Sequence, residues 1–184
     1  VNCAASECVP PYDNPAQAAK TIQEALAYTI DESVVVVAPG DYVLSGPIEL
    51  YDAVRLIAAE GADKTRLIRT GKDASPLFSP VYLNNKDARV KGFAITGGYT
   101  TSKNGGGVLI AAGGGWLEDC IVTNNVCLNY DSQGGGVCCD SADGHISRCR
   151  ILHNQAGPSG SYEYGGGVSI SAGTIDNSLI AWNV

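Results

Sequence analysis

Short apolar runs with an alternating pattern, separated by Gly, Asn and Asp, fill the second half of the chain. Val108 and Ile110 fall on one side of such a run, and runs of the same kind recur at 137–139 and 168–170. Alternation with a period of two predicts β-strands that bury one side, and the residues between the runs are typical of turns. Because Gly triplets interrupt every longer segment, we predict no helix within 97–184.

Two sequence markers recur here with a shared period. Gly-Gly-Gly-Val occurs three times, with starts 29 and 31 residues apart, at 105–108, 134–137 and 165–168. An apolar segment recurs with starts 27, 29 and 29 residues apart, at 90–95, 117–122, 146–151 and 175–180. Strands this short cannot enclose a core alone, so each repeat must bury its apolar side against its neighbours. We therefore predict a parallel solenoid whose coils pair along their strands, about 4.8 Å apart.

Stacked coils place equivalent residues above one another. Two internal apolar ladders are predicted, one from Val108, Val137 and Val168, the other from Ile95, Val122, Ile151 and Ile180. A third ladder, at a turn, is predicted from Asn125, Asn154 and Asn183. Asparagine tolerates left-handed backbone, and its side-chain amide can form hydrogen bonds from coil to coil.

The N-terminal part predicts a helix over 14–30 followed by strands. Asn14 and Pro15 have the character of an N-cap and a first helical residue. An open solenoid end exposes unpaired backbone groups, so we expect this helix to cap it. The strands are predicted at 34–38, 42–44, 48–50, 54–57 and 66–68.

The predicted organisation is a leader over 1–13 and one β-helix domain over 14–184. Within that domain, N-terminal coils span 31–89 and Gly-Gly-Gly-Val repeat coils span 90–184. No second cap is predicted at the C-terminal end, so either the natural chain continues or another subunit covers the exposed edge.

The net charge argues against nucleic acid as a partner, and the shortness of the apolar runs argues against a membrane span. Twelve basic against nineteen acidic residues give a net charge of −7, whereas nucleic-acid binding needs a basic footprint. No apolar run approaches the roughly 20 residues of a transmembrane helix, so we predict no membrane span. A chain of 184 residues is long enough for one domain with a sizeable core.

Several segments of the sequence resemble those of a known protein family. The segments Lys20–Leu26 and Val34–Tyr42 resemble the opening of right-handed parallel β-helix proteins of the pectin-lyase-like superfamily. Gly-Gly-Gly-Val resembles half of the GGA[ILV]/FxxN repeats of polymorphic outer-membrane proteins. The segments 122–125, 151–154 and 180–183 resemble the other half, with an aliphatic residue in place of Phe. The resemblance implies an all-β, right-handed parallel β-helix with an N-terminal capping helix. It implies no single function, because lyases, hydrolases, adhesins and structural shafts share this fold.

The charge of the repeat coils argues against a polysaccharide lyase. Residues 104–184 hold two basic and seven acidic side chains, and this acidic surface works against the anionic substrates that related lyases cleave. The best catalytic constellation is Asp140, Asp143, His145 and Arg148, although 140–144 also has the composition of a solvated turn. His153 adjoins the Asn ladder and is better explained by packing at the turn. Calcium is a further candidate, with Asp131, Asp140 and Asp143 as oxygen ligands.

Seven cysteines without a C-x-x-C pair favour disulfides over a zinc site. Cys120 and Cys149 share one repeat position, and the coil spacing lies within the range of Cα distances that disulfides span. Further candidates are Cys127 with an outward-facing Cys138, and Cys3 with Cys8. Oxidised cysteines predict a secreted or cell-surface protein. The alternative is a set of buried, reduced thiols.

Tyrosines precede each Gly triplet, at Tyr99, Tyr130, Tyr162 and Tyr164. A row of rings along one edge would bind an extracellular polysaccharide or a surface protein, unless the rings fold over their own loops. The sequence favours a non-catalytic structural or adhesive module that self-associates end to end into a homo-oligomer or fibre. The alternative is a carbohydrate-active enzyme, a polysaccharide lyase or hydrolase, or a fragment of one.

Overall fold

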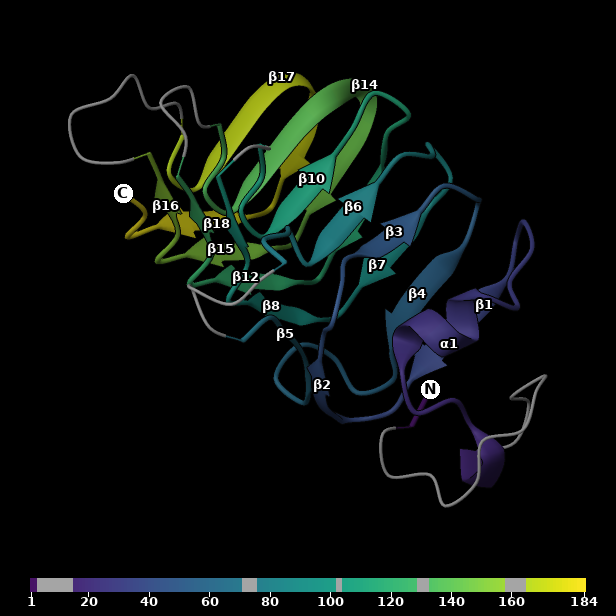
Figure 1. The fold of residues 1–184 in the computed structure, drawn as a ribbon. Helices are drawn as coiled ribbons and strands as arrows, with labels where there is room; N and C mark the ends of the chain where they lie inside the picture. The colour runs from purple at the N-terminus through teal and green to yellow at the C-terminus, as the bar shows by residue number, and fades with distance from the viewer. Residues whose placement is uncertain (3–14, 71–75, 102–103, 129–132, 158–164) are drawn as a thin grey trace.

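The chain forms a parallel β-helix of about four turns, as the repeats predict. The computed structural model describes residues 1–2, 15–70, 76–101, 104–128, 133–157 and 165–184. Figure 1 shows strands of successive coils lying side by side along an axis that begins near the N-terminal helix and ends at β17 and β18.

Within the described residues, three parallel sheets form the walls of the β-helix. The first sheet has the order β1-β4-β7-β11-β14-β10-β6-β3, with β17 also paired to β14. Its strands are β1 (Val34–Val37), β3 (Ile48–Leu50), β4 (Arg55–Ala58), β6 (Val81–Leu83), β7 (Arg89–Lys91), β10 (Val108–Ile110), β11 (Gly115–Glu118), β14 (Val137–Ser147) and β17 (Val168–Asp176). The second sheet consists of β2 (Gly40–Val43), β5 (Thr65–Ile68), β8 (Ala94–Thr96), β12 (Ile121–Thr123), β15 (Arg150–Leu152) and β18 (Leu179–Ala181). The third consists of β9 (Tyr99–Thr100), β13 (Val126–Cys127) and β16 (Gln155–Ala156).

Both apolar ladders are confirmed. The strand register aligns Val108 with Val137 and Val168, and Ile95 with Val122, Ile151 and Ile180. Their members in the inner coils are completely buried. Each such side chain contributes about 1.5–3 kcal/mol through removal of apolar surface from water, so the ladders form the centre of the core.

The Asn ladder is also present, and it is fully hydrogen-bonded. The backbone N–H and the Nδ2 group of Asn125 both donate to Oδ1 of Asn154, each over 3.0 Å. Asn154 donates in the same way to Oδ1 of Asn183, over 2.9 and 3.0 Å. The left-handed backbone expected at these asparagines belongs instead to the residues before them, Asn124 (φ 54°), His153 (φ 55°) and Trp182 (φ 55°).

The Gly triplets share their period with the asparagines of the ladder because the two are in contact. The last glycine of each triplet lies against an asparagine of the ladder, so that a Cβ at Gly107 or Gly136 would come within 2.7 or 2.8 Å of the amide nitrogen of Asn125 or Asn154. Only a residue without a side chain leaves room for the buried amide. The triplets and the asparagines are therefore one packing unit in each coil.

β14 runs through the segment 140–144 that the sequence predicts as a solvated turn. The Ser141 side chain is buried there and donates to the carbonyl of Ala112 over 2.9 Å. Gly144 pairs with Gly115 of β11, and the register with β17 shifts within the segment. The turn prediction is wrong because strands of the neighbouring coils supply backbone partners that the isolated segment lacks.

The N-terminal helix is shorter than predicted. A 3-10 turn, η1 (Pro15–Gln17), is followed by α1 (Ile22–Leu26). Thr21 is the N-cap, because its hydroxyl accepts from the N–H of Glu24 while the Glu24 carboxylate accepts from the N–H of Thr21, both over 3.2 Å. This capping box starts a new helix at residue 22. Asn14, the predicted cap, lies outside the described residues.

α1 nevertheless buries Ile22 and Ala25 against the first coil, as a cap should. The five strands predicted after it are present, with ends shifted by at most two residues. Among the helices of the described ranges, none has the length and hydropathy of a membrane span.

Candidate functional site

Three of the four catalytic candidates, Asp140, His145 and Arg148, have side chains that are each engaged by a different neighbour. The carboxylate of Asp140 accepts a hydrogen bond from the Ser171 hydroxyl over 2.6 Å. Asp143 is exposed, and its backbone N–H donates to the Ser141 hydroxyl. In the ranges that the structure describes, no three His, Cys, Asp or Glu side chains gather closely enough to hold a metal ion. Asp131, the third calcium candidate, lies outside those ranges.

His145 and Arg148 are held by contacts between coils. The His145 ring stacks on Trp116 with a centroid distance of 3.9 Å, and its Nδ1 lies 2.7 Å from the Thr174 hydroxyl. Arg148 donates two hydrogen bonds to Asp119, over 2.7 and 3.2 Å. Both side chains therefore act as links between coils.

A stacked row of planar groups on the first sheet was not found from the sequence. The Arg89 guanidinium lies 4.4 Å from the centroid of the Trp116 ring, and Trp116 in turn stacks on His145. Arg89 and His145 belong to the strands on either side of Trp116. Because both faces of the indole are covered, it offers no open platform for a sugar ring.

Tyr99 is the one tyrosine of the predicted row that the structure describes. It is half-buried in β9, with the Arg69 guanidinium 5.9 Å from its ring centroid. Its register partner in β13 is Val126, and Gln155 follows in β16, so the third sheet does not continue an aromatic row at this position. Tyr130, Tyr162 and Tyr164 lie outside the described residues.

The five described cysteines are all buried: Cys120, Cys127, Cys138, Cys139 and Cys149. Cys120 and Cys149 are neighbours on consecutive coils, since the N–H of Arg150 donates to the Cys120 carbonyl. Burial raises the pKa of the Cys120 thiol well above its usual value. The pairing of these two cysteines stays a prediction.

Cys138 lies outside the core but is not exposed to solvent. It lies outside the main core cluster, in register with Leu109 and Ser169, yet its side chain is completely buried. Burial, and next the negative charge of Asp140, raise the pKa of its thiol. Pairing with Cys127 stays a prediction, and Cys3 and Cys8 lie outside the described residues.

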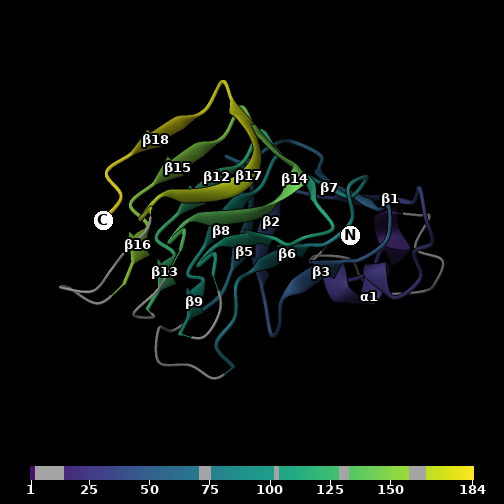
Figure 2. The ribbon, with the colours of Figure 1, turned by 90° about the horizontal axis from the view of Figure 1, so that it is seen from above.

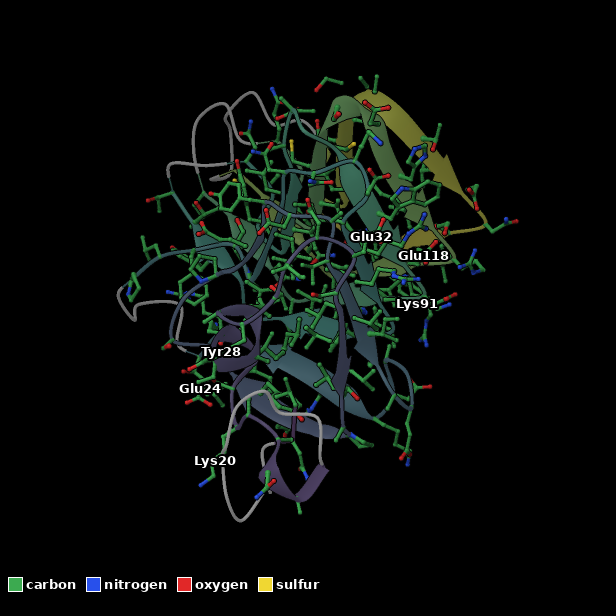
Figure 3. The ribbon with its side chains drawn as sticks, turned by 90° about the vertical axis from the view of Figure 1, so that its right-hand side faces the viewer. Lys20, Glu24, Tyr28, Glu32, Lys91 and Glu118 are labelled. Atoms are coloured by element: carbon green, nitrogen blue, oxygen red, sulfur yellow. The ribbon has the colours of Figure 1, made fainter. Side chains whose placement is uncertain are left out.

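A charged ladder follows the corner between the first and second sheets. Asp119 accepts from Arg148, and the Lys91 ammonium lies 3.5 Å from its carboxylate. Figure 3 shows Lys91 on the side of the molecule opposite Lys20, Glu24 and Tyr28. The hydrogen bonds from Arg148, and secondarily the positive charges nearby, lower the pKa of Asp119.

We expect this ladder to make a small contribution to stability that is lost in acid. A lowered pKa in the folded state stabilises the fold above the unfolded pKa, and the gain disappears as the pH falls from about 5 to about 2. Since Asp119 and Arg148 are 35% and 49% exposed, the gain should be about 0.2–1 kcal/mol. Asp119 has a left-handed backbone (φ 52°), which asparagine also adopts readily, so the test variant is Asp119→Asn. Urea unfolding across this pH range should show a weaker acid dependence in the variant, and identical curves would contradict the assignment.

The C-terminal end exposes residues whose equivalents are buried in every inner coil. Ile170 and Ile180 are 37% and 46% exposed, whereas Ile110 and Ile151, their ladder equivalents, are 0% exposed. Trp182 is 69% exposed, with its ring stacked on His153 at 5.4 Å. Figure 2 shows β17 and β18 at this end of the stack. The exposed face therefore combines apolar side chains with strand edges.

Comparison with known protein families, curated proteins and solved structures finds no match for this chain. The structure therefore shows a parallel β-helix without placing the chain in a known family.

Proposed function

We propose that this protein is a non-catalytic structural module that associates through the C-terminal end of its β-helix. The observation that carries the proposal is that the last described coil presents two ladder isoleucines, Ile170 and Ile180, at its surface, 37% and 46% exposed. Covering such a surface removes apolar area from water and gives partners to the free edges of β17 and β18.

The composition of this end supports association. Residues 165–184 contain a single charged side chain, Asp176. Soluble proteins commonly protect an edge strand with Lys, Pro or inward-pointing charges, and β17 contains neither Lys nor Pro. An apolar strand edge without such protecting residues is typical of a surface that pairs with another chain.

The proposed setting is extracellular or at the cell surface, where a rigid shaft of this kind would present its loops to a polysaccharide or a surface protein. This part of the proposal rests on the cysteine content, on the tyrosines of the loops and on the resemblance to surface β-helices. The alternative, a carbohydrate-active enzyme, gains no added support from Asp140, His145 or Arg148, because each is occupied by a different partner.

The variant Ile180→Lys tests the association. The site is already 46% exposed, so the fold should persist, while a charge placed in the end face should weaken association at least tenfold. Sedimentation velocity over a wide concentration range measures the change. Val43→Lys on β2, where the side chain is 62% exposed, is the matched control and should associate like the parent chain. A parent chain that stays monomeric at every concentration would contradict the proposal.

A further inference from the structure

We infer that Cys120 and Cys149 form a disulfide between two consecutive coils, and that this bond has to form before the coils close around it. The pairing rests on the contacts of the two side chains, and the order of events rests on their burial. Neither depends on the association proposed above, so the two proposals can fail separately.

The two cysteines occupy the same position on consecutive coils, at the corner between the first and second sheets. Cys120 lies between β11 and β12, and Cys149 lies between β14 and β15. The N–H of Arg150 donates to the Cys120 carbonyl over 2.8 Å, as the N–H of Leu179 does to the Cys149 carbonyl one coil later. This pairing sets the two coils one strand spacing apart at the cysteines, about 4.8 Å, which lies within the range of Cα distances that disulfides span.

Both side chains point into the core with the same orientation. Sγ of Cys120 lies 3.1 Å from the carbonyl oxygen of Glu118, and Sγ of Cys149 lies 3.3 Å from that of Ser147, in each case two residues earlier. A hydrogen bond between the two thiols lowers the pKa of Cys149. Because thiols form only weak hydrogen bonds, little is lost when these contacts are exchanged for a covalent bond.

The other described cysteines have different surroundings. Cys139, which also belongs to the core cluster, lies in β14 with its Sγ 3.2 Å from the carbonyl oxygen of Ala172. Cys127 and Cys138 lie outside that cluster. The corner position therefore brings together one pair of thiols.

Burial decides when the bond can form. Cys120 and Cys149 are each 1% exposed, so a dissolved oxidant cannot reach either thiol once the coils have stacked. Oxidation must therefore take place while the chain between them is still open. The same closure excludes reductants afterwards, so the folded protein keeps the redox state in which it folded.

A small disulfide such as oxidised glutathione supplies the oxidant. The thiolate of one cysteine attacks this disulfide, which forms a mixed disulfide and releases one glutathione thiol. The thiolate of the other cysteine then displaces the second glutathione. Two protein thiols are oxidised, one glutathione disulfide is reduced, and the two protons of the cysteines end on the two glutathione thiols.

Oxidative refolding of the whole chain tests the pairing. The reduced chain is refolded from urea with oxidised and reduced glutathione, the remaining thiols are blocked with iodoacetamide in urea, and trypsin is added. Trypsin cleaves after Arg148 and Arg150, so Cys149 is released within the dipeptide 149–150. Tandem mass spectrometry should find this dipeptide linked to Cys120. A blocked Cys149, or a link from Cys149 to any other cysteine, would overturn the pairing.

Two variants control this measurement. Cys120→Ser should leave Cys149 blocked by iodoacetamide, and serine is already the residue at the same corner position one coil later, at Ser178. Cys139→Ser should keep the link, because its thiol has other neighbours. A link that disappears in the second variant and persists at Cys149 in the first would assign Cys139 as the partner instead.

Late addition of the oxidant tests the order of events. The chain is refolded with dithiothreitol, the reductant is removed, and oxidised glutathione is added to the folded protein and, in parallel, to the protein in urea. The Cys149 thiol should disappear at least about ten times more slowly in the folded protein, because its reaction waits for the coils to open. Equal rates would show that the closed coils do not shield the pair, and would leave the pairing itself in place.

Discussion

Replacing Asn154 with Ala should lower the free energy of unfolding by about 3 kcal/mol or more. The side chain is 1% exposed and takes part in hydrogen bonds with both neighbouring coils. Its Oδ1 accepts two hydrogen bonds from Asn125, and its Nδ2 donates to the Val122 carbonyl over 2.9 Å and to Asn183 over 3.0 Å. Each buried group that is left without a partner costs about 1–3 kcal/mol, with partial relief where water enters the space.

Urea unfolding followed by circular dichroism measures this change. Gln155→Ala is the matched control, because Gln155 is the next residue and is exposed, and its variant should change stability by about 0.5 kcal/mol or less. The double variant with Asn125→Ala should cost less than the sum of the two single changes, because the two amides share hydrogen bonds. If Asn154→Ala were no worse than the control, the ladder would be a consequence of coil stacking and not one of its causes.

Replacing Gly135 with Ala should be comparably severe, at about 3 kcal/mol or more. An added Cβ would lie 2.3 Å from the carbonyl carbon and oxygen of Gln155 and 2.5 Å from the carbonyl oxygen of Gly166. These are backbone atoms of neighbouring segments, so the clash is relieved only if the coils move apart. Overpacking of this kind typically costs 1–3 kcal/mol, and here the paired strands leave little room to relax.

Gly46→Ala is the matched control for this substitution. A Cβ at Gly46 would meet no atom within 4 Å, so the change should be neutral or stabilising by about 0.4–1 kcal/mol, since it restricts the unfolded chain. The midpoints of thermal and urea unfolding should therefore fall for Gly135→Ala and should stay unchanged or rise for Gly46→Ala. Equal losses of stability would show that glycine at 135 is required for some reason other than the approach of the neighbouring backbone.

The candidate sites were harder to predict than the fold. The sequence places Asp140, Asp143 and His145 close together along the chain, but their partners come from residues about 30 positions away. Ser171, which binds Asp140, and Thr174, which binds His145, carry no mark in the sequence that distinguishes them from other small polar residues. Arg89, Trp116, His145 and Thr174 each stand one residue before the recurring apolar segment, so the repeat aligns them, but their side chains differ in type and form no sequence motif.

The sequence by itself determined the repeat length, the strands at 108–110 and 48–50, and the residues that stack as ladders. It could do so because side-chain alternation within a strand and a fixed coil length are local properties that recur in each repeat. Only the tertiary structure decided that 140–144 continues a strand and that Cys138 is buried. These features depend on which coil or helix lies next to a residue, and the hydrogen bonds and buried surface supplied by that neighbour outweigh local preference.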